Sequence, residues 1–436
     1  MKGTSLTQTV GYLQLFRQNR NFRYLFFARI SSLLGDWFNV LAVLALLRSM
    51  GHHSATSFGL VLILKTLPSL LMAPIAGVFA DRMSRRLFML LSDIARFFIL
   101  LAMLSLTFFP KVWLLYVLIV LQAMAATFFE PARNALLPEI VNDEELTAAN
   151  TVGAASWSLM LTVGSLLGGL FTAFLGWQAA IAVDALTYLV SMMLLFRLQE
   201  PPMPARPKSN TSTSLIDLLG LRDLYEGWSY IFRRPRILSL VLVKTGWCLA
   251  GSINLVLTLL GERVFAVAGL PMLGVTVLYV ARGIGTGLGP FVSRHLSQSR
   301  EDAMERFIAV GFLCGAVFYM LIPLSPNLWI VCPLLVCAHL GGATIWVFST
   351  IRLQQLVPNE VRGRVFATEQ AGFTVAMAIS TAVYSVFVDK EVASLRWITA
   401  FIGFGMIVPT VLWLLRGWRL GWAGEKAQQE AILKTV

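Results

Sequence analysis

The chain is dominated by one repeated pattern, in which apolar runs of about 20 residues alternate with short charged or turn-rich breaks. A helix rises about 1.5 Å per residue, so each run is long enough to cross the hydrocarbon core of a bilayer. Strands of a membrane barrel would be shorter and would alternate in polarity, which these runs do not. The pattern predicts twelve membrane-spanning helices, over residues 24–47, 57–80, 87–109, 112–132, 147–174, 178–196, 237–260, 271–292, 306–324, 328–350, 366–388 and 397–415.

Composition supports the same class of protein. Hydrophobic residues make up 57% of the 436 positions and charged residues only 13%, a balance outside the range of soluble domains. We therefore expect an all-α membrane protein with twelve transmembrane helices. The four cysteines all fall inside predicted spans, so we expect free thiols.

The twelve runs form two groups of six, separated by a segment of different composition. Residues 199–214 are rich in Pro, Ser and Thr, which predicts a disordered linker. Residues 215–237 then alternate apolar and charged residues at helical spacing, which predicts an interfacial helix. The expected domains are a six-helix bundle at 1–198, a cytoplasmic linker with its interfacial helix at 199–235, a second six-helix bundle at 236–418 and a cytoplasmic tail at 419–436.

The positions of lysine and arginine predict the orientation in the membrane, because cytoplasmic segments hold positive charge against translocation. With both termini cytoplasmic, 25 of the 35 Lys and Arg residues fall in cytoplasmic segments and five in external ones. Topology and contact with anionic lipids then explain the net charge of +12, with no need for a nucleic-acid partner. The basic start leads into a full-length span, so no cleavable signal peptide is expected.

Signatures of enzymes and cofactor sites are missing from the sequence. The glycines of RGIGTGLGP, residues 282–290, lack the spacing of a dinucleotide-binding loop and lie in an apolar span, where they favour close helix packing. The four His residues form no HExxH motif, and there is no P-loop lysine. We therefore expect neither an enzyme nor a bound cofactor or metal.

Sequence similarity between two segments of the chain indicates that its two halves are duplicated. The segment NALLPEIVNDEEL (134–146) is similar to QQLVPNEVRGRVF (354–366) when their prolines are aligned, and Arg133 and Arg352 precede the two segments. Folds built from two such repeats place their site near the bilayer midplane, between the repeats.

The stretch GVFADRMSRR, residues 77–86, follows directly on an apolar run and forms a predicted cytoplasmic turn. It resembles the loop motif G-x3-D-R-x-G-R-[KR] of the major facilitator superfamily, with Ser84 where the family usually has glycine. The resemblance implies a gate, in which the charges of this loop hold the two halves together on the cytoplasmic side in the outward-facing state. The alternative is that the arginines only set the topology. The matching residues are Gly77, Asp81, Arg82, Arg85 and Arg86.

Other segments narrow the resemblance to the drug:proton antiporter branch that holds macrolide efflux proteins and the enterobactin exporter. They are LLGDW (33–37), FFEPARNALLPE (128–139), VDALTYL (183–189), LYVARGIG (278–285) and LVPNEVRGRVFA (356–367). In the fifth span, GSLLGG is similar to the antiporter motif G-P-x-x-G-G, with Gly164, Gly168 and Gly169 present and Ser165 in place of proline.

Partners of the expected gate follow from position along the chain. Glu130 and Arg133 lie at the cytoplasmic end of the fourth predicted span. Asp93 and Arg96 are one helical turn apart in the third span, where an internal ion pair is favoured over a role in the gate.

Charged and polar residues deep in the predicted spans are the candidates for function, because a charge inside a bilayer is costly. At about 1.5 Å per residue they lie roughly 12 to 22 Å from the cytoplasmic ends of their helices. Asp36 is expected to carry the coupling proton and to pair with Lys65. For His339 a hydrogen-bonded core position is the alternative, and Asp184 is expected to make a structural hydrogen bond. The expected substrate cavity comprises Asn39, Lys65, Gln122, Lys244, Arg282 and His339.

These features predict a secondary transporter that works by alternating access in a bacterial cytoplasmic membrane. We expect proton-coupled export of an amphipathic organic compound, such as a drug, a macrolide or a siderophore. Cations outnumber carboxylates among the deep residues, which favours a substrate with anionic or strongly polar oxygen groups. The alternatives are a transporter of lysophospholipid or another anionic solute, and a receptor or scaffold that transports nothing. Expected partners are the small-molecule substrate, protons and membrane lipids, with the protein acting as a monomer.

Overall fold

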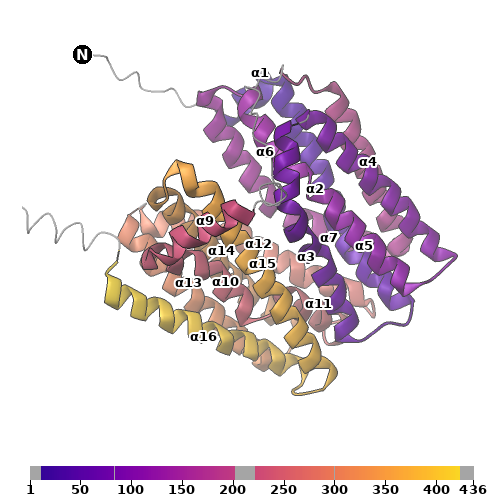
Figure 1. Cartoon of the computed structure of the whole chain (residues 1–436). Helices are drawn as coiled ribbons and strands as arrows, with labels where there is room; N and C mark the ends of the chain where they lie inside the picture. The colour runs from indigo at the N-terminus through magenta and orange to yellow at the C-terminus, as the bar shows by residue number, and fades with distance from the viewer. Residues whose placement is uncertain (1–10, 83, 202–220, 299, 423–436) are drawn as a thin grey trace, which may run out of the picture. The chain divides into compact units, whose positions relative to one another are not determined.

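The structure is a computed structural model that describes residues 11–82, 84–201, 221–298 and 300–422 (Figure 1). Over these ranges it consists almost entirely of α-helices, with two short 3-10 helices and one isolated β-bridge between Val267 and Leu270. Most of the linker expected at 199–214 and of the tail expected at 419–436 lies outside the described residues.

Contacts within the chain divide it into two compact units. The first comprises Met1–Gly51 and Pro68–Leu219, and the second comprises His52–Leu67 and Gly220–Val436. The helix α3 (Ala55–Arg82) therefore contributes to both units. The expected first bundle, residues 1–198, contains all of this helix, whereas the contacts place its N-terminal part with the second unit.

In the first unit, α7 makes the most extensive contacts, and α5 and α6 pack on α4. Both α2 and α4 make extensive contacts with α7 (Figure 1). The buried hydrophobic cluster beside it includes Phe22, Leu25, Phe88, Phe129 and Leu195. The helices of this unit besides α3 are α1 (Tyr12–Gln18), α2 (Arg20–Ser49), α4 (Arg85–Leu104), α5 (Val112–Ala126), α6 (Phe129–Ile140) and α7 (Asp143–Arg197).

In the second unit, α14 packs against both α12 and α13, and α10 packs on α15. The α10 helix ends at Ala250, and a break at Gly251 and Ser252 separates it from α11 within one span. The helices of this unit besides α3 are α9 (Leu221–Phe232), α10 (Pro235–Ala250), α11 (Ile253–Arg263), α12 (Pro271–Ser297), α13 (Glu301–Leu321), α14 (Leu328–Leu356), α15 (Asn359–Asp389) and α16 (Leu395–Leu420).

Eleven helical segments among the described residues are long and apolar enough to cross a membrane. The longest, Glu144–Arg197, is interrupted at Gly176, where φ is 83° and ψ is 169°. Glycine adopts this backbone conformation readily because it has no Cβ. The segment therefore holds two of the predicted spans, and the all-α fold with twelve spans is confirmed over the described residues. The cytoplasmic location of both termini stays a prediction.

Glycines allow close helix contacts at two places. On α7, a Cβ added to Gly168 would lie 2.9 Å from the Cα atom of Phe38 on α2, and one added to Gly164 would lie 3.0 Å from the Cβ atom of Trp37. On α12, a Cβ added to Gly285 would lie 3.0 Å from the Cα atom of Val336 on α14. The antiporter-like motif and the 282–290 glycine run thus both lie at close helix crossings.

The amphipathic segment expected at 215–237 is helical over α9. Ile231 is buried, whereas Tyr225, Trp228 and Phe232 are exposed. Glu226 pairs with Arg364 of α15 at 2.7 Å. Helix α9 therefore packs on α15 and exposes large apolar side chains, and its position at the membrane interface stays a prediction.

The N-terminus of α3 is held by the C-terminal end of α15. Asp389 accepts hydrogen bonds from the backbone N–H groups of Ala55 (2.7 Å) and Thr56 (2.8 Å). In addition, Arg263 donates to the carbonyl oxygen of His53. A carboxylate at a helix N-terminus satisfies free N–H groups and interacts favourably with the helix dipole. These contacts explain why residues 52–67 belong to the second unit.

Candidate functional site

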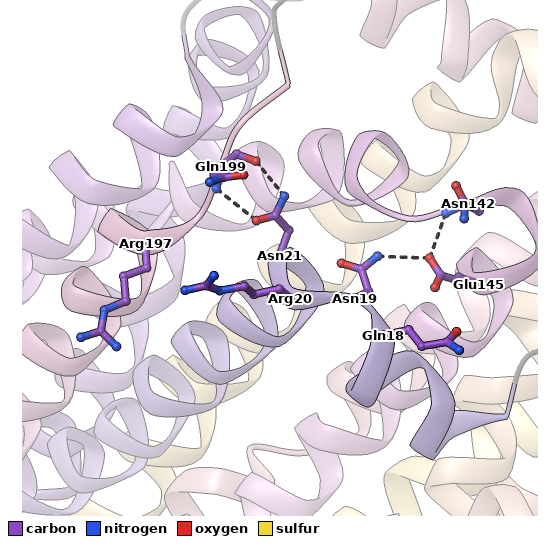
Figure 2. A pocket seen from close by; sticks show the side chains of 8 residues that line it. All are labelled: Gln18, Asn19, Arg20, Asn21, Asn142, Glu145, Arg197 and Gln199. Atoms are coloured by element: carbon purple, nitrogen blue, oxygen red, sulfur yellow. Dashed lines mark hydrogen bonds between the residues drawn. The ribbon is translucent and has the colours of Figure 1, made fainter.

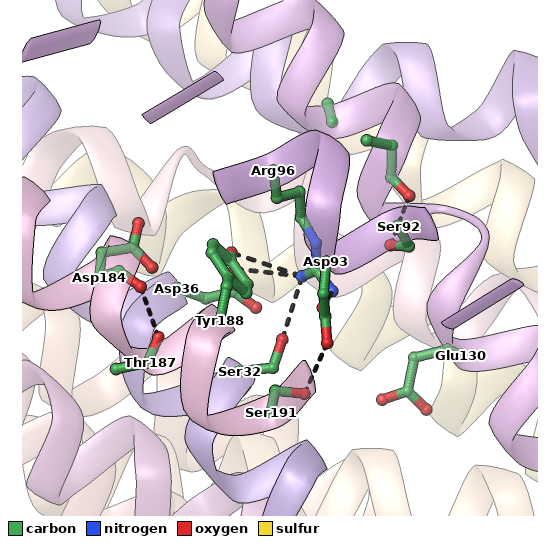
Figure 3. Close-up of polar contacts among 12 residues, drawn as sticks. Ser32, Asp36, Ser92, Asp93, Arg96, Glu130, Asp184, Thr187, Tyr188 and Ser191 are labelled. Carbon is green, nitrogen blue, oxygen red and sulfur yellow. Dashed lines mark hydrogen bonds and ion pairs between the residues drawn. The ribbon is translucent and has the colours of Figure 1, made fainter. Parts of the chain in front are cut away.

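A buried ion pair lies where α4 packs on α7 in the first unit (Figure 3). Asp93 and Arg96 face the same side of α4, and the side chains are 0% and 3% exposed. Arg96 Nη2 lies 2.5 Å from Asp93 Oδ1, and Ser191 Oγ of α7 donates to Asp93 Oδ2 at 2.6 Å. The expected internal ion pair is present, and a residue of α7 completes the hydrogen bonding of its carboxylate.

Arg96 also reaches a second carboxylate. Its Nη1 donates to Ser32 Oγ at 3.0 Å and to the hydroxyl of Tyr188 at 3.4 Å, and its guanidinium carbon lies 4.4 Å from the Tyr188 ring centroid. The Tyr188 hydroxyl donates to Asp36 Oδ1 at 2.9 Å, and Arg96 Nη1 itself is 3.9 Å from that oxygen. Arg96 and Tyr188 thus link the buried Asp93 to Asp36, whose side chain is 45% exposed (Figure 3).

Three other expected residues of the first unit, Asn39, Gln122 and Asp184, are buried in its helices. Asn39 is buried on α2, one turn from Asp36, and Gln122 is buried on α5. Asp184 is buried on α7, and its carbonyl oxygen accepts a hydrogen bond from Thr187 at 2.7 Å. Lys65 lies in the part of α3 that belongs to the second unit, so its pairing with Asp36 stays a prediction.

The expected partners of the gate contact one another within the first unit. Glu130 lies between two arginines, with Arg29 Nε at 2.8 Å and Arg133 Nη1 at 3.4 Å. Arg29 also donates to the carbonyl oxygen of Gly153 at 2.7 Å, which ties α2 to α6 and α7.

The turn that bears the family-like motif is anchored at its second half. Arg85 pairs with Glu139 of α6, and its backbone N–H donates to Glu200 Oε1 at 2.7 Å. Arg86 Nε donates to the carbonyl oxygen of Leu195 at 2.8 Å. The remaining motif residues, Gly77, Asp81 and Arg82, lie in the last turns of α3, and the side chains of Asp81 and Arg82 are not among those described.

A polar pocket of about 540 Å³ lies near the ends of α1, α2 and α7 (Figure 2). Asn19 donates to the carbonyl oxygen of Ile140 at 2.7 Å and to Glu145 Oε2 at 3.1 Å, and Asn21 exchanges hydrogen bonds with the backbone of Gln199. These side chains satisfy one another and the helix ends, so we assign the pocket to helix termination. It is separate from the Arg96 network.

In the second unit, Lys244 of α10 pairs with a residue that sequence analysis missed. Its Nζ lies 3.0 Å from Glu369 Oε1 of α15, and the two side chains are 5% and 3% exposed. Lys244 also donates to Thr350 Oγ1 at 2.9 Å, and its Nζ lies 5.1 Å from the Trp346 ring centroid. The sequence does show Glu369 as a carboxylate inside a predicted span, within ATEQAG (367–372). It lies close to the basic cytoplasmic end of that span, so it was not among the deep residues.

Two further expected residues of the second unit, His339 and Arg282, have neutral partners. His339 is buried and forms a 2.9 Å hydrogen bond with the hydroxyl of Tyr319, as the core alternative expected. Arg282 donates to the side-chain oxygen of Asn254, at the start of α11. Arg282 therefore anchors α12 to α11 through an amide.

A further cluster, at one end of the second unit, was also missed. Glu305 is fully buried and accepts from Arg236 Nη2 at 3.2 Å, from Arg352 Nε at 3.2 Å and from Arg416 Nη1. Arg352 also pairs with Glu301 at 2.9 Å. Sequence analysis counted these arginines as topological charge, whereas the structure shows that they fasten α10, α14 and α16 to α13.

The arginines that precede the two similar segments, 134–146 and 354–366, have similar surroundings. Arg133 pairs with Glu130 in the first unit, and Arg352 pairs with Glu301 and Glu305 in the second. Within the described residues, no group of three or more His, Cys, Asp or Glu side chains is placed to hold a metal ion.

A twelve-span helical fold with ion pairs buried inside both units is that of a multi-pass membrane transporter. The chain belongs to the Major Facilitator Superfamily, whose family model matches residues 25–381. It is therefore a transport protein for a small-molecule substrate and not an enzyme.

The chain is similar over most of its length to transport proteins of Bacillus subtilis and Streptococcus pyogenes. It is 26% identical to the MFS-type transporter YfiS of Bacillus subtilis, over 84% of this chain and 87% of that protein. Identity is 25% to a protein of B. subtilis named as a bacilysin exporter, BacE, with 83% and 87% covered. Identity is 24% to macrolide efflux protein A of Streptococcus pyogenes, with 77% and 82% covered.

Solved structures show the same fold. A POT family transporter in complex with 5-aminolevulinic acid gives a TM-score of 0.71 at 13% identity, over 94% of this chain and 99% of that one. The nucleoside transporter NupG gives 0.68 at 12% identity, over 91% and 99%.

Proposed function

We propose that this protein exports an amphipathic organic compound in exchange for protons, by alternating access across a bacterial cytoplasmic membrane. The outward direction of substrate transport is supported by the names of two relatives, a bacilysin exporter and a macrolide efflux protein. The protein works as a monomer among membrane lipids and takes its substrate and protons as partners.

The observation that carries proton coupling is that Arg96 contacts two carboxylates. With Asp36 and Asp93 both ionised, this trio has a net charge of −1, because one guanidinium serves two carboxylates. Protonation of one carboxylate removes the surplus. Asp93 is fully buried and Asp36 is half exposed, so Asp36 is the group that exchanges the proton with water.

Proton binding at Asp36 changes contacts between three helices. A charged Asp36 holds the Tyr188 hydroxyl and attracts Arg96, and a hydrogen bond to a charged group is about twice as strong as a neutral one. Protonation weakens both contacts, so α2 is held less firmly against α4 and α7. Such a difference is what shifts a protein between two conformations of similar energy.

The turn at 77–86 acts as the cytoplasmic gate of this cycle. Arg85 and Arg86 are fixed by Glu139 and by the end of α7, which supports a rigid attachment of the turn to the first unit. Asp81 and Arg82 then carry the contacts that form and break. Replacing Asp81 by Asn would impair transport without preventing insertion, because it weakens a contact present in only one state.

The test is transport by purified protein in liposomes under an imposed proton gradient. A panel of macrolides, peptide antibiotics, catecholate siderophores and labelled lysophospholipid identifies the substrate. Asp36→Asn should lose accumulation against a gradient and retain downhill exchange. Glu144→Gln, an exposed carboxylate in the first turn of α7, is the matched control and should transport normally.

Two outcomes would overturn the proposal. Accumulation by Asp36→Asn at the wild-type level would remove Asp36 from proton coupling. Movement of lysophospholipid alone would replace drug-like export by lipid transport.

A further inference from the structure

The ion pair of Lys244 and Glu369 is not used by proton exchange at Asp36. It joins α10 to α15 at 3.0 Å, with both side chains almost completely buried. Removing two charges from water is costly, so a buried pair is weak support for stability. Ionisable residues kept inside a membrane span are by default candidates for function.

The surroundings of Lys244 combine a hydroxyl with aromatic rings. Thr350 accepts a hydrogen bond from Lys244 Nζ at 2.9 Å and donates to the carbonyl oxygen of Trp346 at 2.8 Å. The Trp346 ring lies 5.1 Å from Nζ, within the range of a cation–π contact, and meets the Phe373 ring edge-on at 5.1 Å. Trp346 is 37% exposed, so one ring that contacts the buried cation is itself partly accessible.

We propose that Lys244 binds the anionic group of the substrate and that Glu369 takes this place when the substrate is absent. This inference rests on the proposed transport function and names the substrate class. The ligand is an organic anion whose carboxylate, or a similar oxyanion, sits next to an apolar ring. The oxyanion pairs with Lys244 and Thr350, and the ring lies on Trp346 and Phe373.

Charge balance at this site has a measurable consequence. Lys244 neutralises one carboxylate, so an anion that displaces Glu369 leaves a second carboxylate buried without its cation. An isolated buried carboxylate takes up a proton, because the neutral form costs far less. Each substrate anion therefore binds together with one proton, and its affinity rises about tenfold for each pH unit that the pH falls. This proton is distinct from the one exchanged at Asp36 and travels outward with the anion. Exchange of the neutral acid for the proton at Asp36 therefore moves one net negative charge outward per cycle, which the membrane potential drives.

The experiment is equilibrium binding of radiolabelled 1-naphthoate to the full-length protein in nanodiscs between pH 6 and pH 8, with neutral 1-naphthamide as the matched probe. Wild-type protein should prefer naphthoate, with an affinity that rises as the pH falls, and should bind naphthamide equally at all pH values. Glu369→Gln imitates the protonated acid and should bind naphthoate more tightly at pH 8, with a flat pH profile. Lys244→Gln should abolish the preference for naphthoate.

A purely structural pair gives a different pattern. In that case Glu369→Gln lowers the melting temperature without a gain in naphthoate binding, and the exchanged pair Lys244→Glu/Glu369→Lys restores stability. That pattern, or a wild-type protein that does not prefer naphthoate, overturns the inference. Asp36→Asn should bind naphthoate as the wild type does. If proton-coupled export fails, the binding of naphthoate at Lys244 can therefore still be confirmed. If naphthoate binding fails, the role of Asp36 in proton exchange is not affected.

Discussion

Tyr188 of α7 donates a 2.9 Å hydrogen bond to Asp36 of α2, while its ring centroid lies 4.4 Å from the guanidinium carbon of Arg96. One side chain thus touches both the half-exposed carboxylate and the buried cation. A change of charge at Asp36 reaches Arg96 through this ring as well as through their direct 3.9 Å contact.

Tyr188→Phe should slow proton-driven transport about five- to tenfold, because a hydrogen bond to a charged group contributes about 1.5 to 3 kcal/mol and part of it is replaced by water at Asp36. The dependence of transport on pH should change as well. Initial rates in liposomes between pH 5.5 and pH 8.5 measure both effects. Tyr319→Phe, which removes the hydroxyl that bonds His339, is the control and should keep the wild-type pH dependence.

Asp93→Asn should lower the thermal stability of the protein in detergent far more than Asp36→Asn. Breaking a buried ion pair by removing one partner costs about 3 to 5 kcal/mol, whereas Asp36 is half exposed. The double variant Asp93→Asn/Arg96→Leu removes the orphaned cation and should recover part of the loss. Equal melting temperatures for the two single variants would contradict the role given to Asp93.

For the site, the sequence could predict only contacts between residues that are close together on one helix. Asp93 and Arg96 lie at i and i+3, so their contact was predictable, and the glycine run at 282–290 indicated close helix packing. The number and length of the spans were predictable for the same reason, since each follows from a continuous apolar run.

Contacts between helices distant in sequence were not predictable in this way. Tyr188 meets Asp36 across 152 residues, and Glu369 meets Lys244 because α15 packs on α10. A single sequence does not state which helices are neighbours or how they are rotated. The deep cations were therefore counted without Glu369, and the count overstated the positive charge around Lys244.

Gly168→Ala should destabilise the protein by about 1 to 3 kcal/mol, the usual effect of overpacking a tight contact. The added methyl would meet the backbone of Phe38 on α2, which cannot move aside as a flexible side chain does. Gly363→Ala, on α15, is the matched control, because nothing lies within 4 Å of its added Cβ. Melting temperatures compare the two, and an equal or larger loss in Gly363→Ala would refute the close crossing.

Ser84→Ala should loosen the first turn of α4, whereas Ser84→Gly should loosen it less. The Ser84 hydroxyl accepts from the backbone N–H of Leu87 at 3.1 Å and donates to Glu200. Loss of a serine N-cap costs about 1 kcal/mol when alanine replaces it and a few tenths when glycine does. Hydrogen exchange of residues 85–89 measures the difference, and identical protection in all three proteins would exclude the cap.

Cysteines introduced at positions 205 and 430, in a protein whose native cysteines are replaced, should resist an impermeant thiol reagent added to intact cells. Both positions lie in segments that the distribution of Lys and Arg places in the cytoplasm. A cysteine at position 111, in a predicted external segment, is the positive control. Labelling of residue 205 or 430 from outside would reverse the topology.

The sharing of α3 bears on how the chain would tolerate being divided. The boundary between the two units falls at Leu67 and Pro68, and a proline inside a helix removes one backbone hydrogen bond and favours a bend at that point. A cut in the linker around residues 202–220 would leave Ala55 and Thr56 on the N-terminal fragment and the Asp389 that caps them on the C-terminal fragment. The C-terminal fragment would then lack residues 52–67 of its own unit, so split halves should mature only when synthesised together, with the N-terminal part of α3 supplied to the second unit by the N-terminal fragment.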